Sequence, residues 1–380
     1  MLMVTQVRPL VEVLAEIPDF RKRRGLRHPL AAVLALVCVG LLCNYDSYGA
    51  VSAWGADHGE RFLSMLGFTA ARYPCASTLF NVLKGIDRKE LEAKLKAWAE
   101  EILAALPAPD DAASEALAAD GKTLRGSRKQ GMPGAHLLSV VSHRLGLSLG
   151  QQAVSDKTNE IPVLVEVLKG LVLEGRVLTV DALLTQREIS QTIVDKGGDY
   201  VMTVKENQPL LRASIERVFQ EPKGFPMDVA TDLDFGHGRI ERRTLTATSA
   251  LVGYADWPGM QQVYRLERRV TTKKSGRQTC EVVYGVTSLS GERAGAKQLL
   301  AYNRGHWCIE NRVHWVRDVT FDEDRSQTRC GSVPQALAAF RNLVIGLMRI
   351  AGHSNVAAGR RHYAAQPQEA LALLGIAVDN

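Results

Sequence analysis

The chain has 380 residues and a formal net charge of +6, and 46% of its residues are hydrophobic. Its length predicts two or three domains, each with its own core, and the composition is ordinary for a soluble globular protein. The most apolar run, Leu30 to Cys43, has 14 residues, fewer than the roughly 20 that span a bilayer, so we expect a buried helix there and no membrane segment. The modest basic excess is compatible with a polyanionic partner without requiring one.

The six cysteines are scattered along the chain and form no Cys-x-x-Cys pair. A zinc site is therefore not expected, and a reduced, cytoplasmic protein is the simplest interpretation. Cys308 and Cys330 lie near His306 and His314 in the sequence, but idle or buried thiols are the expected state.

Residues 1–106 are expected to form a helical N-terminal domain, because their apolar residues recur with a spacing near 3.6. We expect this domain to have a DNA-binding or accessory role. Five basic residues lie between Arg21 and Arg27. This short run is equally compatible with a solvated segment and with an arm that contacts phosphates. Residues 107–116 are rich in Pro, Asp and Ala and predict a linker.

Strand and helix patterns alternate from residue 117 to residue 227, which predicts an α/β region with a central sheet. Two of its short apolar strands end on an acidic residue, Asp120 in LAADGK and Asp181 in LTVDAL. A single Asp at such a place is explained by capping of the next turn. Two in one sheet favour a ligand site, because ligands gather at the carboxyl ends of strands.

Residues 228–292 are predicted to form a β-rich insertion, and between Arg239 and Arg277 they contain nine Lys or Arg against three acids. A charged solvent-exposed face and a face for nucleic-acid phosphates explain this excess equally well. Helices are expected again from residue 293 to 352, and residues 353–380 are expected to form a C-terminal tail.

Glu310 lies in the stretch AYNRGHWCIENRVHWVRDVTFDED. With 3.6 residues per turn, it would share one helix face with Asn303, His306, His314 and Arg317, while Ile309, Val316 and Val319 would be buried. Trp307 and Trp315 are expected in the core more than stacked on a base. A polar stripe of this kind can bind a ligand, although a solvated helix face also explains it.

Three carboxylates that lie close together repel one another, and a divalent metal makes such a cluster tolerable. Mg²⁺ prefers oxygen ligands, and two such ions about 4 Å apart support in-line phosphoryl transfer. Asp120, Asp181 and Glu310 therefore indicate phosphodiester cleavage or strand joining.

Several motifs together resemble the DDE transposases of bacterial insertion sequences, specifically the ISAs-type group that includes the H-repeat-associated proteins of Rhs elements. They are PDFRKRRGLRHPL, AADGKTLRGS around Asp120, KTNEIP, LTVDALLTQ around Asp181, VKENQP, GHGRIERR and HWCIENRVHWVRDVTFDED around Glu310. The resemblance covers nearly the whole chain. It implies an α/β fold, with a ribonuclease-H-like catalytic domain formed by residues 117–227 and 293–352, the β-rich insertion between them, and the α-helical N-terminal domain.

The resemblance also implies a function. Asp120, Asp181 and Glu310 would bind two Mg²⁺ ions, with Mn²⁺ as a substitute. The protein would cut at the terminal inverted repeats of its element and transfer the freed 3′ hydroxyl to target DNA, as a homodimer on DNA. A related nuclease without strand transfer and an inactive DNA-binding remnant are the alternatives.

The wider superfamily has a Y-x2-R-x3-E-x6-K signature around the glutamate, whose places hold Asn303, His306, Glu310 and Arg317 here. Only the glutamate and a basic last residue are retained, so phosphate contact is expected for Arg317, with His306 and Arg304 as further candidates. Basic or polar residues after the two aspartates complete the predicted DNA contacts: Lys122, Arg125, Lys205 and Asn207.

Overall fold

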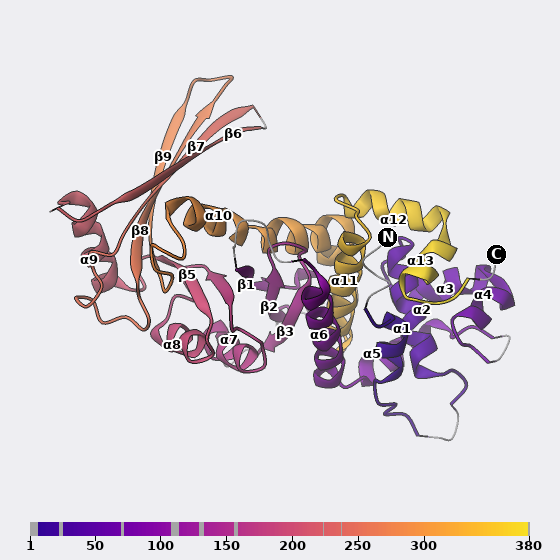
Figure 1. Cartoon of the computed structure of the whole chain (residues 1–380). Coiled ribbons are helices and arrows are strands. Elements are labelled where there is room, and N and C mark those ends of the chain that lie inside the picture. Colours follow the sequence, from indigo (N-terminus) through magenta and orange to yellow (C-terminus); the bar gives the residue numbers. More distant parts are fainter. Residues whose placement is uncertain are drawn as a thin grey trace. The chain divides into compact units, whose positions relative to one another are not determined.

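The computed structural model describes residues 7–22, 26–69, 72–107, 114–128, 133–155, 159–222, 224–236 and 238–378 (Figure 1). The chain forms two compact units that are interleaved along the sequence. The helical unit contains Met1–Pro107, Gly121–Lys157 and Ile309–Asn380, and the sheet unit contains Ala108–Asp120 and Thr158–Cys308. Within the described residues, no helix combines the length and the apolar character needed to cross a membrane.

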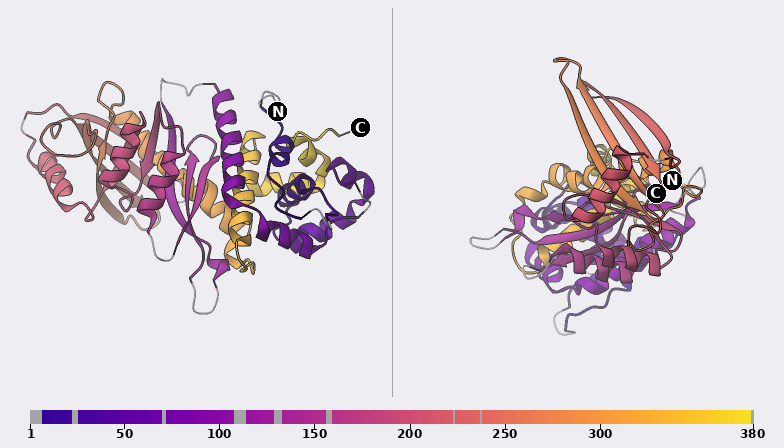
Figure 2. Two further views of the ribbon diagram at one scale, coloured as in Figure 1. Left: turned by 90° about the horizontal axis from the view of Figure 1, so that it is seen from below. Right: turned by 90° about the vertical axis from the view of Figure 1, so that its left-hand side faces the viewer.

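The helical unit is built around α2, whose residues are buried on almost every side. A helix that is apolar all round needs neighbours on all sides, and α1, α3, α5, α11, α12 and α13 pack against it. Figures 1 and 2 show the N-terminal helices (indigo) gathered with the C-terminal helices (yellow). The α-helices of this unit are α1 (Leu10–Ala15), α2 (Leu30–Leu42), α3 (Tyr48–Asp57), α4 (Gly59–Met65), α5 (Ala76–Gly85), α6 (Arg88–Ala105), α11 (Val333–Ile350), α12 (Val356–Ala365) and α13 (Pro367–Leu373).

The helical unit also contains a β-hairpin, made of β2 (His136–Ser142) and β3 (Ser148–Val154). Helices α6 and α11 both pack against β3. Strand β1 (Glu115–Thr123) begins in the sheet unit and ends in the helical unit, where the strand order is β3-β2-β1.

The strands of the sheet unit are hydrogen-bonded in the order β1-β4-β5-β9-β8-β7-β6. Strands β1, β4 and β5 are parallel, and β9 joins β5 in the antiparallel direction. The sheet unit comprises β4 (Arg176–Val180), β5 (Asp199–Val204), β6 (Asp228–Gly236), β7 (Arg239–Thr248), β8 (Gln262–Thr272) and β9 (Gln278–Thr287), with α7 (Glu160–Lys169), α8 (Arg187–Asp195), α9 (Pro209–Gln220) and α10 (Ala296–His306). The architecture is thus mixed α/β with a helical N-terminal region, as predicted.

The predicted β-rich insertion forms a four-stranded antiparallel ribbon, β6 to β9, which Figure 2 shows extending from the rest of the sheet unit. Sequence patterns predict three of its strands and miss β6, whose sequence DVATDLDFG is rich in Asp. The acids of β6 are satisfied by α10: Asp228 accepts a hydrogen bond from the Ala296 backbone N–H, and Asp232 pairs with Arg304.

The predicted domain boundaries differ from the two units. Residues 117–227 and 293–352, expected to form one catalytic domain, are divided between the units. Residues 353–380, expected to form a tail, contain α12 and α13 of the helical unit. Most of the expected linker, residues 108–113, lies outside the described residues.

Candidate catalytic site

Asp120 and Asp181 lie side by side in the sheet unit. The parallel pairing of β1 with β4 sets Ala119 opposite Val180. The residue that follows each of them is an aspartate, so the two aspartates lie next to each other in the direction in which both strands run. Asp181 directly follows β4, whereas β1 continues for three residues beyond Asp120. Both side chains are half-buried, and the residues directly before them, Ala119 and Val180, are buried and apolar.

The two aspartates are electrostatically coupled. Burial raises the pKa of Asp181, and the nearby negative charge of Asp120 raises it further. The Leu184 backbone N–H donates to Asp181 Oδ1 at 3.1 Å and partly opposes this rise. Two carboxylates of like charge near the carboxyl ends of adjacent parallel strands offer the oxygen ligands that a divalent cation such as Mg²⁺ prefers.

His306, the last residue of α10, faces the same two carboxylates. Its Nδ1 lies 3.1 Å from the hydroxyl of Thr179, a buried residue of β4. Burial lowers the pKa of His306, and the charges of Asp120 and Asp181 act in the opposite direction. The structure therefore places His306 near Asp120 and Asp181.

Glu310 belongs to the helical unit and lies four residues after His306 in the chain. Its side chain is 51% exposed, and one carboxylate oxygen lies 3.3 Å from Nδ1 of the buried His314. This carboxylate is thus accessible, with an imidazole beside it as a possible second ligand within the helical unit.

The helix that contains Glu310 does not have the predicted period. Ile309–His314 and Val316–Thr320 are π-helical, so the polar stripe expected at 3.6 residues per turn is wrong after α10. Ile309 and Val316 are buried as expected, but Val319 is 58% exposed. Trp307 and Trp315, expected in the core, are 63% and 53% exposed.

Two of the predicted DNA contacts are buried within the helical unit and need correction. Arg317 has no exposed surface and forms an ion pair with Glu323 at 2.8 Å. Lys122 is 8% exposed and pairs with Asp318. Both cations are neutralised inside the protein, so neither is available to a phosphate in this conformation. The acidic run that follows Arg317 in the sequence was the signal for its internal partner, Glu323.

The remaining predicted contacts divide into two groups. Arg304 pairs with Asp232 and Asp234 of β6, and the Asn207 amide donates to the Ala182 carbonyl oxygen at 2.6 Å, which is the role of a turn residue. Arg125 is 70% exposed, 3.8 Å from Asp324, and Lys205 is exposed. Arg125 and Lys205 stay predicted DNA contacts.

Comparison with known proteins places the chain among related sequences. The family model described as "DDE_Tnp_1-associated" matches residues 11–99, and the model "Transposase DDE domain" matches residues 111–347. "Putative transposase YncI" of Escherichia coli O157:H7 is 28% identical over 90% of this chain and 88% of its own length. "H repeat-associated putative transposase YhhI" of Escherichia coli K12 is 26% identical over 90% and 91%.

A solved structure of a piggyBac transposase synaptic complex with hairpin DNA aligns with 99% of this chain and 79% of its own, at 11% identity and a TM-score of 0.43, too low for a fold to be inferred from it. The family model, in contrast, covers more than half of the chain, including Asp120, Asp181 and Glu310. The chain therefore belongs to the DDE transposase family, is similar to its H-repeat-associated members, and has a mixed α/β fold with a β-rich insertion and a helical N-terminal region.

Proposed function

We propose that this transposase cuts DNA at the ends of its element in a metal-dependent reaction and transfers the freed 3′ hydroxyl to target DNA. The observation that supports this most directly is that Asp120 and Asp181 lie side by side near the carboxyl ends of adjacent strands, where burial and the negative charge of Asp120 raise the pKa of Asp181. Such a pair is poorly suited to structural stabilisation and well suited to binding cations.

Asp120, Asp181 and Glu310 would hold two Mg²⁺ ions, which Mn²⁺ can replace. When bound, these ions supply Lewis acidity toward the phosphodiester and help to deprotonate the attacking water or hydroxyl. The chain's own contribution is to fix the ligands: the β1–β4 register sets the spacing of the aspartates, and Leu184 N–H orients the Asp181 carboxylate. His306, oriented by Thr179, would contact the DNA at the cleaved bond.

DNA is the proposed partner, as terminal inverted repeats and as target, with two copies of the chain holding the two ends. The ribbon supports this proposal. On one of its faces Arg242 lies directly opposite Arg269, an arrangement of like charges that destabilises a sheet unless an anion lies nearby. Within the described part of the ribbon, Arg269 pairs with Glu267, and Arg242 has no carboxylate partner. A phosphate backbone would supply the missing negative charge.

The test is an assay with purified protein, Mn²⁺ and labelled DNA that carries the inverted repeats flanking the gene. Asp120→Asn, Asp181→Asn and Glu310→Gln should each lower cleavage by about 10³-fold or more, whereas Asp195→Asn, an acid on α8 bonded to Gln191, should cleave like wild type. Cleavage without joined products would favour the nuclease alternative. Equal cleavage by the Asp181→Asn variant would disprove the proposed metal site.

A further inference from the structure

A group of oppositely charged side chains lies in the interior of the helical unit. Glu323 accepts hydrogen bonds from Arg317 (Nε to Oε2, 2.9 Å) and from Arg341 (Nη1 to Oε1, 2.8 Å). Arg317 is fully buried, and Glu323 and Arg341 are each 2% exposed. Burial alone would raise the pKa of Glu323, but the positive charges of Arg317 and Arg341 outweigh it and lower that pKa. Glu323 is therefore held as a carboxylate between two arginines.

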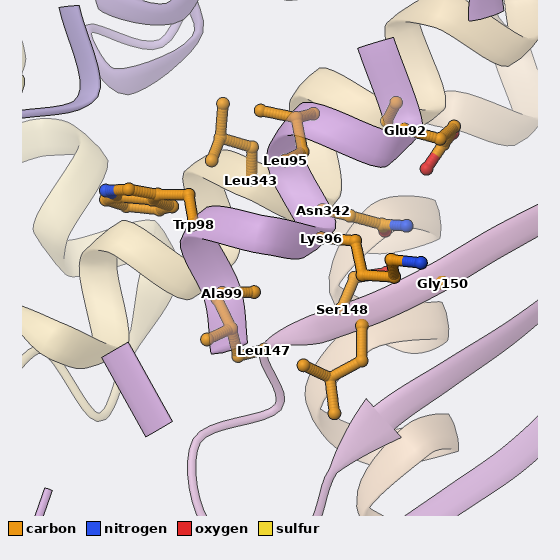
Figure 3. Close-up of a pocket in the computed structure, with 12 residues that line it drawn as sticks. Glu92, Leu95, Lys96, Trp98, Ala99, Leu147, Ser148, Gly150, Asn342 and Leu343 are labelled. Atoms are coloured by element: carbon orange, nitrogen blue, oxygen red, sulfur yellow. The ribbon is translucent and has the colours of Figure 1, made fainter. Parts of the chain in front are cut away.

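The group continues through two amides to the N-terminal helices. Arg317 Nη1 donates to Asn342 Oδ1 at 3.4 Å, Asn342 Nδ2 donates to Gln151 Oε1 at 2.9 Å, and Gln151 Nε2 donates to Glu92 Oε1 at 3.0 Å. Figure 3 shows Glu92 of α6 and Asn342 of α11 at one small cavity, of about 20 Å³, which residues of β3 also line. A continuous path of hydrogen bonds thus joins α6, β3 and α11 to Arg317.

Other elements fix the residues on either side of Arg317. Arg360 of α12 donates from Nη1 to the Thr320 carbonyl oxygen at 2.6 Å, and its guanidinium carbon lies 4.1 Å from the centre of the Phe321 ring. Lys122 of β1 pairs with Asp318. The segment from residue 317 to 321 is therefore held from three directions.

The segment held in this way is π-helical. The Phe321 N–H donates to the Val316 carbonyl oxygen, five residues earlier, at 3.2 Å. π-Helical turns are rare and are frequently found at functional sites. A buried ion pair contributes little net stability compared with apolar packing, and its best-attested benefit is one defined geometry. Both features point to a requirement for fixed geometry in the helix that contains Glu310.

We propose that Glu323 is a positioning residue, which acts through Arg317 and Arg341 to hold these π-helical turns in the register that presents Glu310 to the metal. The proposal rests on the proposed function in one respect, that Glu310 is a metal ligand. Glu323 itself is only 2% exposed, so it would act without direct contact with DNA. Its effect is exerted through the backbone of residues 309–321.

Two measurements on the full-length protein test this proposal: amide hydrogen exchange of residues 309–321, and Mn²⁺ binding followed by electron paramagnetic resonance. Glu323→Gln keeps the side-chain shape and removes the charge. It should raise exchange in residues 309–321 by about tenfold more than in α2, and should weaken Mn²⁺ binding by about tenfold, as loss of a supporting contact does in metal sites. Glu323→Asp, which keeps the charge, should recover part of both effects. Glu369→Gln, which removes an exposed carboxylate next to His362, should change neither.

A folded Glu323→Gln protein with wild-type exchange in residues 309–321 and Mn²⁺ affinity within twofold of wild type would overturn the proposal. If this variant does not fold, Arg341→Lys, which keeps the charge and removes the fork, is measured in the same way and judged by the same criteria. Mn²⁺ binding by Glu310→Gln that equals wild type would instead contradict the metal role of Glu310, and hydrogen exchange alone would then decide the role of Glu323. Neither measurement requires the protein to cleave DNA.

Discussion

Two clusters of charged side chains in this transposase follow opposite rules. In the sheet unit, Asp120 and Asp181 have the same charge, and burial together with mutual repulsion raises the pKa of Asp181. In the helical unit, Glu323 is more deeply buried, yet its pKa is lowered because two arginines surround it. The balance of charge, more than burial, separates the cluster proposed to bind a metal from the one that holds the fold together.

The largest effect on stability is expected when the carboxylate between Arg317 and Arg341 is lost. Glu323→Gln removes the ion pairs of both buried arginines, and should lower the free energy of unfolding by about 3 to 5 kcal/mol, the usual cost of breaking a buried pair. Urea denaturation followed by circular dichroism measures this change. A loss below about 1 kcal/mol would contradict the stabilising role of Glu323 between the two arginines.

The pair formed by Asp120 and Asp181 should instead be stabilised by a bound metal ion. Mn²⁺ at 100 times its dissociation constant should raise the free energy of unfolding of the wild-type protein by about 2.7 kcal/mol, because only the folded state brings the ligands together. Asp181→Asn should abolish this gain. In the absence of metal the variant should be at least as stable as wild type, since it removes a repulsion. Thermal unfolding with and without Mn²⁺ provides the measurement, and an equal gain in the variant would contradict the site.

Glu92 lies at the end of the hydrogen-bond path that begins at Arg317, and there the nearby positive charge does not offset the effect of burial. Burial raises the pKa of Glu92 to about 8, although it accepts a hydrogen bond from Gln151 and lies near the charge of Arg317. Between the ordinary carboxyl pKa and about 8, the folded chain binds a proton that the unfolded chain lacks, so stability falls as pH rises through this range.

Glu92→Gln cannot titrate and should remove this dependence. The variant should therefore exceed wild type by about 1 to 3 kcal/mol at pH 9, with the difference vanishing towards pH 5. Denaturation at several pH values tests the sign. Glu90→Gln, an exposed acid on the same helix, is the control and should show no such trend. A gain that grows as pH falls would contradict the assignment.

The sequence predicted one part of the candidate site better than the other. Asp120 and Asp181 could be found because strand patterns are local, and parallel pairing then brings the ends of the two strands together. Arg317 was misassigned because its turns are π-helical and do not have the expected period of 3.6, and because its ion pair with Glu323, six residues later, was not inferred from the acidic run. A helical wheel drawn at 3.6 residues per turn therefore assigns the residues after the first π-helical turn to the wrong face of the helix.

Pairings between distant residues were also beyond the sequence. Lys122 and Asp318 are 196 residues apart, and nothing in the local pattern of either residue identifies the other. Strand β6 was missed because its aspartates lower strand propensity, and contacts with α10 override this preference. The fold class was predictable since it depends on the alternation of elements, whereas these partners depend on tertiary packing.

The smallest expected effect concerns the two faces of the ribbon, where an arginine with a carboxylate partner is next in sequence to one that has none within the described strands. Arg243 is paired with Glu241, whereas its neighbour Arg242 points to the other face, opposite Arg269. If DNA binds that face, Arg242→Gln should weaken binding a few-fold and reduce the slope of log affinity against log salt by about 1, as loss of one phosphate contact does. Arg243→Gln should change the slope less, because Glu241 already neutralises its charge. Fluorescence anisotropy across a salt series distinguishes the two, and equal slopes for both variants would show that DNA does not select between the faces.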